Sequence, residues 1–120
     1  MKKLITILAS VILSFGLFAQ NAEVKGDEAS LKEDVASGNI EIIFPESTKA
    51  EDIEKSAEYY VDYFTVDYNA ETRLAKITMV DNTSQSRRVI KRLLLSNNVR
   101  TIDFNGESYS INDFHSKYID

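Results

Sequence analysis

The chain has 120 residues, a formal net charge of −5 and no cysteine. An acidic surface repels the phosphate backbone, so the composition argues against a nucleic-acid partner. The missing cysteines exclude disulfides and thiolate ligands for soft metal ions, and the length suits a single folded domain.

Residues 1–19 have the three parts of a secretory signal peptide. Lys2 and Lys3 give a positive start, an uncharged apolar run follows, and Ala19 supplies a small residue before the cut. Ala22 is a second candidate cleavage point. The alternative is a membrane anchor, but a spanning helix needs about 20 apolar residues and this run is shorter. We therefore predict export to the periplasm or the extracellular space, with no stable membrane anchor after cleavage.

Residues 20–38 are polar and acidic, and we expect them to form a disordered linker before the domain. Their apolar residues are sparse, which leaves little surface to bury against a core. Leu31 and Val35 are four residues apart, so a short helix is the alternative. The folded domain is then expected over residues 39–120.

The domain opens with a strand and a helix. Residues 40–44 are nearly continuous in apolar side chains, as expected for a central strand, and Pro45 ends it. Thr48 and Glu51 have the spacing of a capping box, which predicts a helix that starts at Thr48 or just after it. This helix is expected to end near Asp62, because alternation typical of a strand begins soon after it.

An antiparallel hairpin and a second helix follow. Residues 64–68 and 74–80 are two strand-like runs joined by a short polar loop, which is typical of a hairpin. Asn97 and Asn98 suit a left-handed helix stop. A helix is expected between residue 80 and this stop. Its buried face is predicted to comprise Ser86, Val89, Ile90, Leu93 and Leu94.

The last part of the chain predicts a second hairpin. Residues 99–104 form the fourth strand, and Asn105 and Gly106 match a type I′ turn, which requires positive φ at both positions. Residues 107–111 then fold back as a short fifth strand, and Asn112 is expected to cap a final helical turn.

These elements predict an α+β protein with a ferredoxin-like βαββαβ sandwich. Right-handed crossovers place both helices on one face of an antiparallel sheet with strand order 4-1-3-2, and the hairpin adds a strand at its edge. A meander with packed helices is the alternative. The acidic face of the first helix is expected to lie opposite the basic face of the second. The acidic residues are Glu51, Glu54, Glu58 and Asp62, and the basic ones are Arg87, Arg88, Lys91 and Arg92.

Residues 39–104 resemble a heavy-metal-associated domain. The resemblance lies in the order and length of the elements and in residues 65–72, Thr-Val-Asp-Tyr-Asn-Ala-Glu-Thr. This stretch is similar to the segment that follows the first helix in that family. Family members bind soft metals through Cys-x-x-Cys between the first strand and the first helix. Residues 45–50 occupy that place here and contain no cysteine, so the resemblance implies the fold without its metal ligands.

The sequence contains no recognisable catalytic or metal-binding motif. It has neither a Gly-x-Ser-x-Gly nucleophile elbow nor a calcium loop of the EF-hand type. His115, the only histidine, would act as a base or metal ligand only together with carboxylates, and the alternative is an exposed residue near the end of the chain. We therefore predict a protein that is not an enzyme and has no cofactor.

Two groups of side chains are candidate protein contacts. Tyr59 and Tyr63 lie off the apolar face of the first helix, and tyrosines outside a core are favoured at interfaces. The basic face of the second helix suits an acidic partner, although solvated surface charge is the simpler interpretation. Its residues are Arg87, Arg88, Lys91 and Arg92.

Together these features predict a small exported domain that binds an unidentified protein partner and catalyses no reaction. One alternative is a divergent metal-handling domain that uses oxygen and nitrogen ligands. Another is an exported enzyme inhibitor or folding helper, which rests on analogy with other small exported domains.

Overall fold

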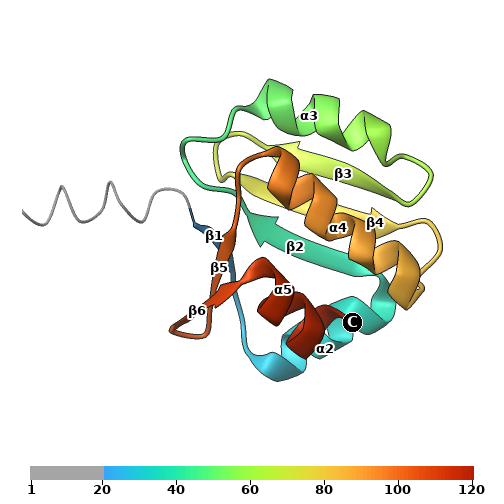
Figure 1. Cartoon of the computed structure of the whole chain (residues 1–120), viewed down its shortest axis with the longest axis vertical. Coiled ribbons are helices and arrows are strands. Elements are labelled where there is room, and N and C mark those ends of the chain that lie inside the picture. Colours follow the sequence, from blue (N-terminus) through green and yellow to red (C-terminus); the bar gives the residue numbers. More distant parts are fainter. Residues whose placement is uncertain (1–20) are drawn as a thin grey trace, which may run out of the picture.

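A computed structural model describes residues 21–120 as one six-stranded sheet with helices packed on it (Figure 1). The predicted signal peptide, residues 1–19, lies outside the described residues. The strands are β1 (Ala22–Val24), β2 (Asn39–Ile43), β3 (Phe64–Asn69), β4 (Leu74–Met79), β5 (Thr101–Phe104) and β6 (Glu107–Ser110). The helices are α2 (Glu28–Ser37), α3 (Ala50–Tyr59), α4 (Ser84–Ser96) and α5 (Ile111–Phe114), and α5 continues into the π-helical turn η1 (His115–Ile119).

The sheet is mixed, with strand order β3-β4-β2-β1-β5-β6. β1 pairs antiparallel with β2 and parallel with β5, so β5 and β2 run in opposite directions on its two sides. The α+β class is as predicted. The predicted order 4-1-3-2 corresponds to β5-β2-β4-β3, and it is wrong as a description of neighbouring strands because β1 separates β5 from β2.

The stretch predicted to be a disordered linker forms β1 and α2 instead. Ala22 and Val24 are buried in the core, on one face of a strand of 3 residues. Asp27 caps α2, because its carboxylate accepts a hydrogen bond from the Ser30 amide at 2.8 Å while the Ser30 hydroxyl accepts one from the Asp27 amide. Gly38 ends the helix with φ of 78°, a conformation that favours glycine. The linker prediction failed because sparse apolar residues suffice when neighbouring strands bury them.

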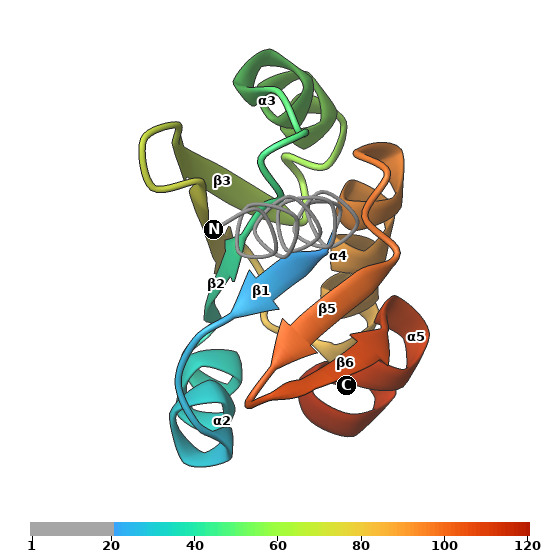
Figure 2. The ribbon, with the colours of Figure 1, turned by 90° about the vertical axis from the view of Figure 1, so that its left-hand side faces the viewer.

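One face of the sheet is covered and the other is open. Side chains alternate along β2 and β4, so that Ile40, Ile42 and Ile77 are buried while Glu41 and Lys76 are exposed. α3, α4 and the α5–η1 segment cover the buried face, and α2 lies beside η1 at one end of the sheet (Figures 1 and 2). The helices contribute their own apolar residues to the same core, namely Leu31, Ile53, Ile90, Leu93, Leu94, Phe114 and Ile119.

Several predicted boundaries and turns can be compared directly. The turn at Asn105 and Gly106 is confirmed, with φ of 51° and 82°, and Asn98 after α4 is left-handed with φ of 62°. The predicted capping box at Thr48 is wrong, because α3 begins at Ala50 and its N-cap residue, Lys49, makes no side-chain cap. α3 also ends earlier than predicted, at Tyr59, because the chain turns sharply there to enter β3.

The packing of α2 predicts a specific loss of stability. Replacing Leu31, which is only 2% exposed, by alanine should lower the free energy of unfolding by about 2–5 kcal/mol. The matched control is Lys32→Ala, which changes an exposed neighbour on the same helix and should stay within about 0.5 kcal/mol. Urea denaturation measures both. Equal stability of the two variants would show that α2 does not pack on the domain.

Candidate functional site

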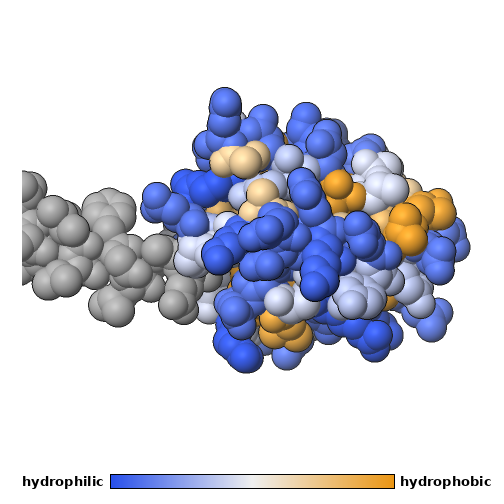
Figure 3. Space-filling view, turned by 90° about the horizontal axis from the view of Figure 1, so that it is seen from above, coloured by the Kyte–Doolittle hydropathy of each residue, from blue (hydrophilic) through white to orange (hydrophobic). Residues whose placement is uncertain are grey.

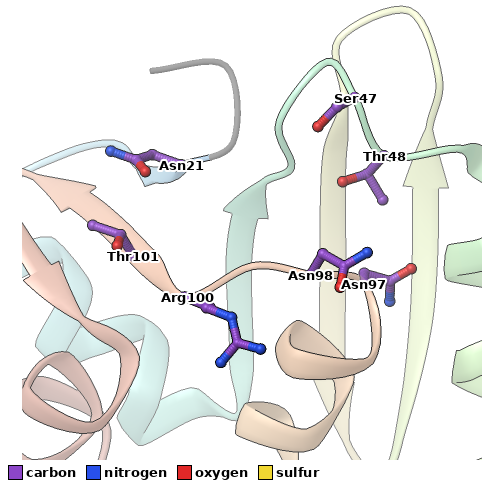
Figure 4. A pocket seen from close by; sticks show the side chains of 7 residues that line it. All are labelled: Asn21, Ser47, Thr48, Asn97, Asn98, Arg100 and Thr101. Carbon is purple, nitrogen blue, oxygen red and sulfur yellow. The ribbon is translucent and has the colours of Figure 1, made fainter. Parts of the chain in front are cut away.

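Seven polar residues line a cavity of about 550 Å³ at the end of the sheet where β2 leads into α3 (Figure 4). They come from three separate parts of the chain. One precedes β1, two lie in the loop between β2 and α3, and four follow α4. The lining residues are Asn21, Ser47, Thr48, Asn97, Asn98, Arg100 and Thr101.

The end of α4 fixes one side of this cavity. Asn97 caps the helix through its backbone amide and is only 7% exposed. Its side-chain amide donates to the Leu93 carbonyl at 2.9 Å and lies 3.4 Å from the Ser56 hydroxyl on α3. Val99 is fully buried, so the chain is anchored on both sides of Asn98 before it reaches Arg100. Packing and hydrogen bonds therefore hold the chain in place on this side of the cavity.

Among residues 21–120, the cavity lining contains one charged side chain, Arg100, which is exposed. A carboxylate lies at its rim. The side-chain amide of Asn21 donates to the Asp103 carboxylate at 3.3 Å, which holds Asn21 at the rim. The N-terminus of α3 begins just after Thr48, and the amides of an uncapped helix start carry partial positive charge. This arrangement suits a hydrophilic group that accepts hydrogen bonds.

The loop between β2 and α3 supplies hydroxyl groups to the cavity. Ser47 is exposed and Thr48 half-buried, and both line the cavity. Among residues 21–120, no three His, Cys, Asp or Glu side chains lie close enough together to hold a metal ion. Sequence reasoning missed the cavity, because its residues lie far apart in the chain. The only local cue was the helix stop at Asn97 and Asn98.

His115 is buried rather than exposed, so the expectation of an exposed residue is wrong. The residue is 4% exposed, and its Nε2 has no hydrogen-bond partner among the described residues. Burial lowers its pKa from 6.5 to about 4. The cations of α4 act in the same direction and the Asp120 carboxylate, with Oδ1 4.0 Å from Nε2, acts against them. The contributing cations are Lys91, Arg88 and Arg87.

The groups around His115 do not form a catalytic triad. The Ser84 hydroxyl donates to Asp120 Oδ1, and the same oxygen faces His115. A nucleophilic serine must instead donate to the imidazole, with the carboxylate on its far side. Here the carboxylate lies between the other two groups, so Ser84 fastens the end of η1 to the start of α4 and is not activated.

The predicted tyrosine contacts are exposed. Tyr59 is 77% and Tyr63 43% exposed, and two residues that the sequence did not single out, Val61 and Val80, are exposed as well. The Val80 amide donates to the Tyr63 carbonyl at 3.0 Å, which places these two residues side by side. Figure 3 shows apolar side chains at the right-hand end of the molecule, the side on which Figure 1 places the α3–β3 loop and the end of β4.

Two of the predicted basic residues of α4, Arg87 and Arg88, contact the end of the C-terminal segment. Arg87 Nε donates to the Ile119 carbonyl at 2.8 Å, and Arg88 Nε lies 3.5 Å from Asp120. Lys91 lies beside His115 around a small internal gap, while Arg92 is exposed. Within residues 21–120, no ion pair joins α4 to the acidic residues of α3. The predicted pairing is wrong because the α5–η1 segment packs on this side of α4.

Comparison of the chain with models of protein families found no match. Comparisons with curated proteins and with solved structures found none either. Among residues 21–120, no helix has both the length and the apolar character needed to cross a membrane.

The buried imidazole predicts a stability that depends on pH. The pKa of His115 is about 4 in the folded protein and 6.5 in the unfolded chain. The free energy of unfolding is therefore not reduced by His115 above pH 6.5, and it falls as the pH drops towards 4, because the unfolded chain then binds a proton that the folded protein does not. The loss should be roughly 3 kcal/mol. Urea denaturation should be compared between pH 7 and pH 4.5, which is about two pH units below the unfolded pKa. The His115→Leu variant should not show this loss of stability at low pH. An unchanged pH profile in this variant would contradict the burial of a neutral histidine.

Proposed function

We propose that this chain is a small exported domain that binds a hydrophilic ligand in its polar cavity and catalyses no reaction. The observation that supports this most directly is the convergence of seven polar residues from three parts of the chain on one cavity. Its volume, about 550 Å³, falls in the range of about 300–1,000 Å³ that is usual for small-molecule sites.

The lining favours a ligand that carries a carboxylate. Most small-molecule sites are largely apolar, whereas amides, hydroxyls and a guanidinium line this one. Arginine binds a carboxylate through two parallel hydrogen bonds, and Arg100 is the group that would do so here. Ser47, Thr48 and Asn98 then offer hydrogen bonds to hydroxyls or amides elsewhere in the ligand. A small amino acid or sugar acid has this combination of groups.

We also propose that the fold is a ferredoxin-like core with β1 inserted into it. Leaving β1 aside, β5-β2-β4-β3 would form an antiparallel sheet in the predicted order 4-1-3-2. Kinship with heavy-metal-associated domains is consistent with this arrangement. The cavity then lies at the loop where that family binds metal, so a change from thiolates to hydroxyls would accompany a change of ligand.

Export is part of the proposal, and the position of β1 bears on where cleavage would occur. Ala22 is fully buried and pairs with Ile102 of β5. Cleavage after Ala22 would remove this residue and Asn21 from the fold, whereas cleavage after Ala19 leaves both in place. Expression of the whole chain in a bacterium with a secretory pathway, followed by intact-mass analysis of the exported fraction, should give a mature protein that begins at Gln20. Retention in the cell or a start at Glu23 would contradict this.

The ligand proposal is tested with the Arg100→Gln variant. In a thermal-shift panel of acetate, glutamate and glucuronate, at least one compound should stabilise the protein, by ~2.7 kcal/mol at 100 times its Kd. Arg100→Gln should lower the affinity for that ligand by about tenfold or more, because a charge-assisted hydrogen bond contributes about 1.5–3 kcal/mol. Arg92→Gln, an exposed arginine on α4, is the matched control and should leave the affinity unchanged.

The same thermal-shift assay with metal ions decides between the alternatives. Calcium, zinc and copper(II) should leave the melting temperature unchanged, and a higher melting temperature with one of them instead of the carboxylates would favour a metal-handling domain. If no compound raises the melting temperature, or if both arginine variants weaken binding equally, the cavity is not the binding site.

A further inference from the structure

β3 is an edge strand whose outer side has no partner in the described part of the chain. It pairs with β4 over six consecutive residues without a bulge, and nothing follows it in the strand order (Figure 2). Proteins usually protect such edges with charged side chains, especially lysine, or with proline, a bulge or a very short strand. β3, Phe-Thr-Val-Asp-Tyr-Asn, has one charged residue, Asp67, and no lysine, proline or bulge.

The unpaired backbone groups can be assigned from the register. In an antiparallel pair, opposed residues alternate between those that exchange hydrogen bonds and those that do not. The Tyr63 carbonyl accepts from the Val80 amide, so the bonded positions continue at Thr65 and Asp67. The backbone groups of Val66 and Tyr68 therefore point away from β4. No turn, loop or side-chain hydrogen bond within residues 21–120 engages them.

The two faces of β3 differ in character. Val66 and Tyr68 point towards the helices and are only half-buried, although both pack against the core, and Tyr68 meets Phe44 edge-on at 6.2 Å. Thr65 and Asp67 are exposed on the open face of the sheet. An added strand would thus present apolar side chains to one face and polar side chains to the other.

Charge indicates what kind of strand can be added. Residues 56–72, which contain β3 and the turns on both sides of it, include four carboxylates. Lys55 and Arg73 border this stretch and Lys76 of β4 lies opposite Asp67, so the edge carries a small excess of negative charge. A second copy of this chain would bring like charges together across the new pair, which is unfavourable. A segment with basic residues at alternate positions would instead oppose these carboxylates. The carboxylates are Glu58, Asp62, Asp67 and Glu71.

We propose that the outer edge of β3 binds an extended segment of another protein by strand addition, with apolar side chains that alternate with lysine or arginine. The backbone groups of Val66 and Tyr68 pair with the added strand. Its apolar side chains cover the exposed parts of the same two residues, and its basic side chains face Asp67. This surface is separate from the polar cavity, so it goes beyond the proposed ligand-binding function. The exposed Tyr59, Val61 and Tyr63 lie just before the strand and extend the contact.

The experiment uses a fluorescent peptide of about nine residues, a usual strand length, in which valine and lysine alternate. Fluorescence anisotropy at about 0.15 M salt, where the Debye length is about 8 Å, limits unspecific attraction. The peptide should bind saturably. A peptide of the same sequence with N-methyl groups on alternate amides keeps its charge and side chains but cannot pair as a strand. Its affinity should be at least about tenfold weaker.

Two charge-reversal variants of the protein provide the matched comparison. The double variant Asp62→Lys, Asp67→Lys should bind the lysine peptide about tenfold or more weakly, because like charges then face each other. Glu28→Lys with Glu33→Lys makes the same change in net charge on exposed positions of α2 and should change the affinity by less than about threefold. Arg100→Gln should leave peptide binding unchanged, which separates this proposal from the cavity proposal.

Four results would overturn the proposal. Equal binding of the N-methylated peptide would show that no strand is added, and equal effects of the two double variants would show that only net charge matters. Absence of saturable peptide binding, or a dimer in sedimentation analysis that Asp67→Lys abolishes, would show that the edge does not take a basic segment of another protein.

Discussion

The structure depends on β1, a strand of only 3 residues that joins two parts of the sheet. On one side it pairs with β2, and on the other with β5, so β5 and β6 are connected to the remaining strands through it alone. Ala22 and Val24 contribute buried side chains to the core from this position. The residue before β1, Asn21, reaches the polar cavity and is held there by Asp103. Sheet continuity and the cavity therefore share one short element.

The C-terminal segment has a second organising role, because it determines which face of α4 remains available. Arg87 and Arg88 bind the backbone and carboxylate at the end of η1, and Ser84 binds the same carboxylate. These contacts enclose His115, and burial first, then the cations of α4, lowers the pKa of its imidazole. The basic face of α4 is thus partly an internal surface.

The sequence was sufficient where local patterns alone determine structure. The nearly continuous apolar run of residues 40–44 predicted a strand inside the sheet, and Ile40 and Ile42 are buried there. The turn at Asn105 and Gly106 followed from the need for positive φ. It was insufficient for β1, because three residues carry no periodicity and their pairing depends on strands that follow much later. The cavity was missed for the same reason, since Asn21 and Arg100 are brought together only by the pairing of β1 with β5.

Amide hydrogen exchange of β1, followed by NMR, tests this account most directly. If β1 is a central strand that holds the sheet together, the amides that it pairs with β2 and β5 should exchange only through global unfolding, as slowly as those of β2. Exchange of the β1 amides at the rates of an unstructured peptide, with β2 protected, would show that the strand is not part of the stable sheet. The cavity and the separation of β5 from β2 would then both be wrong.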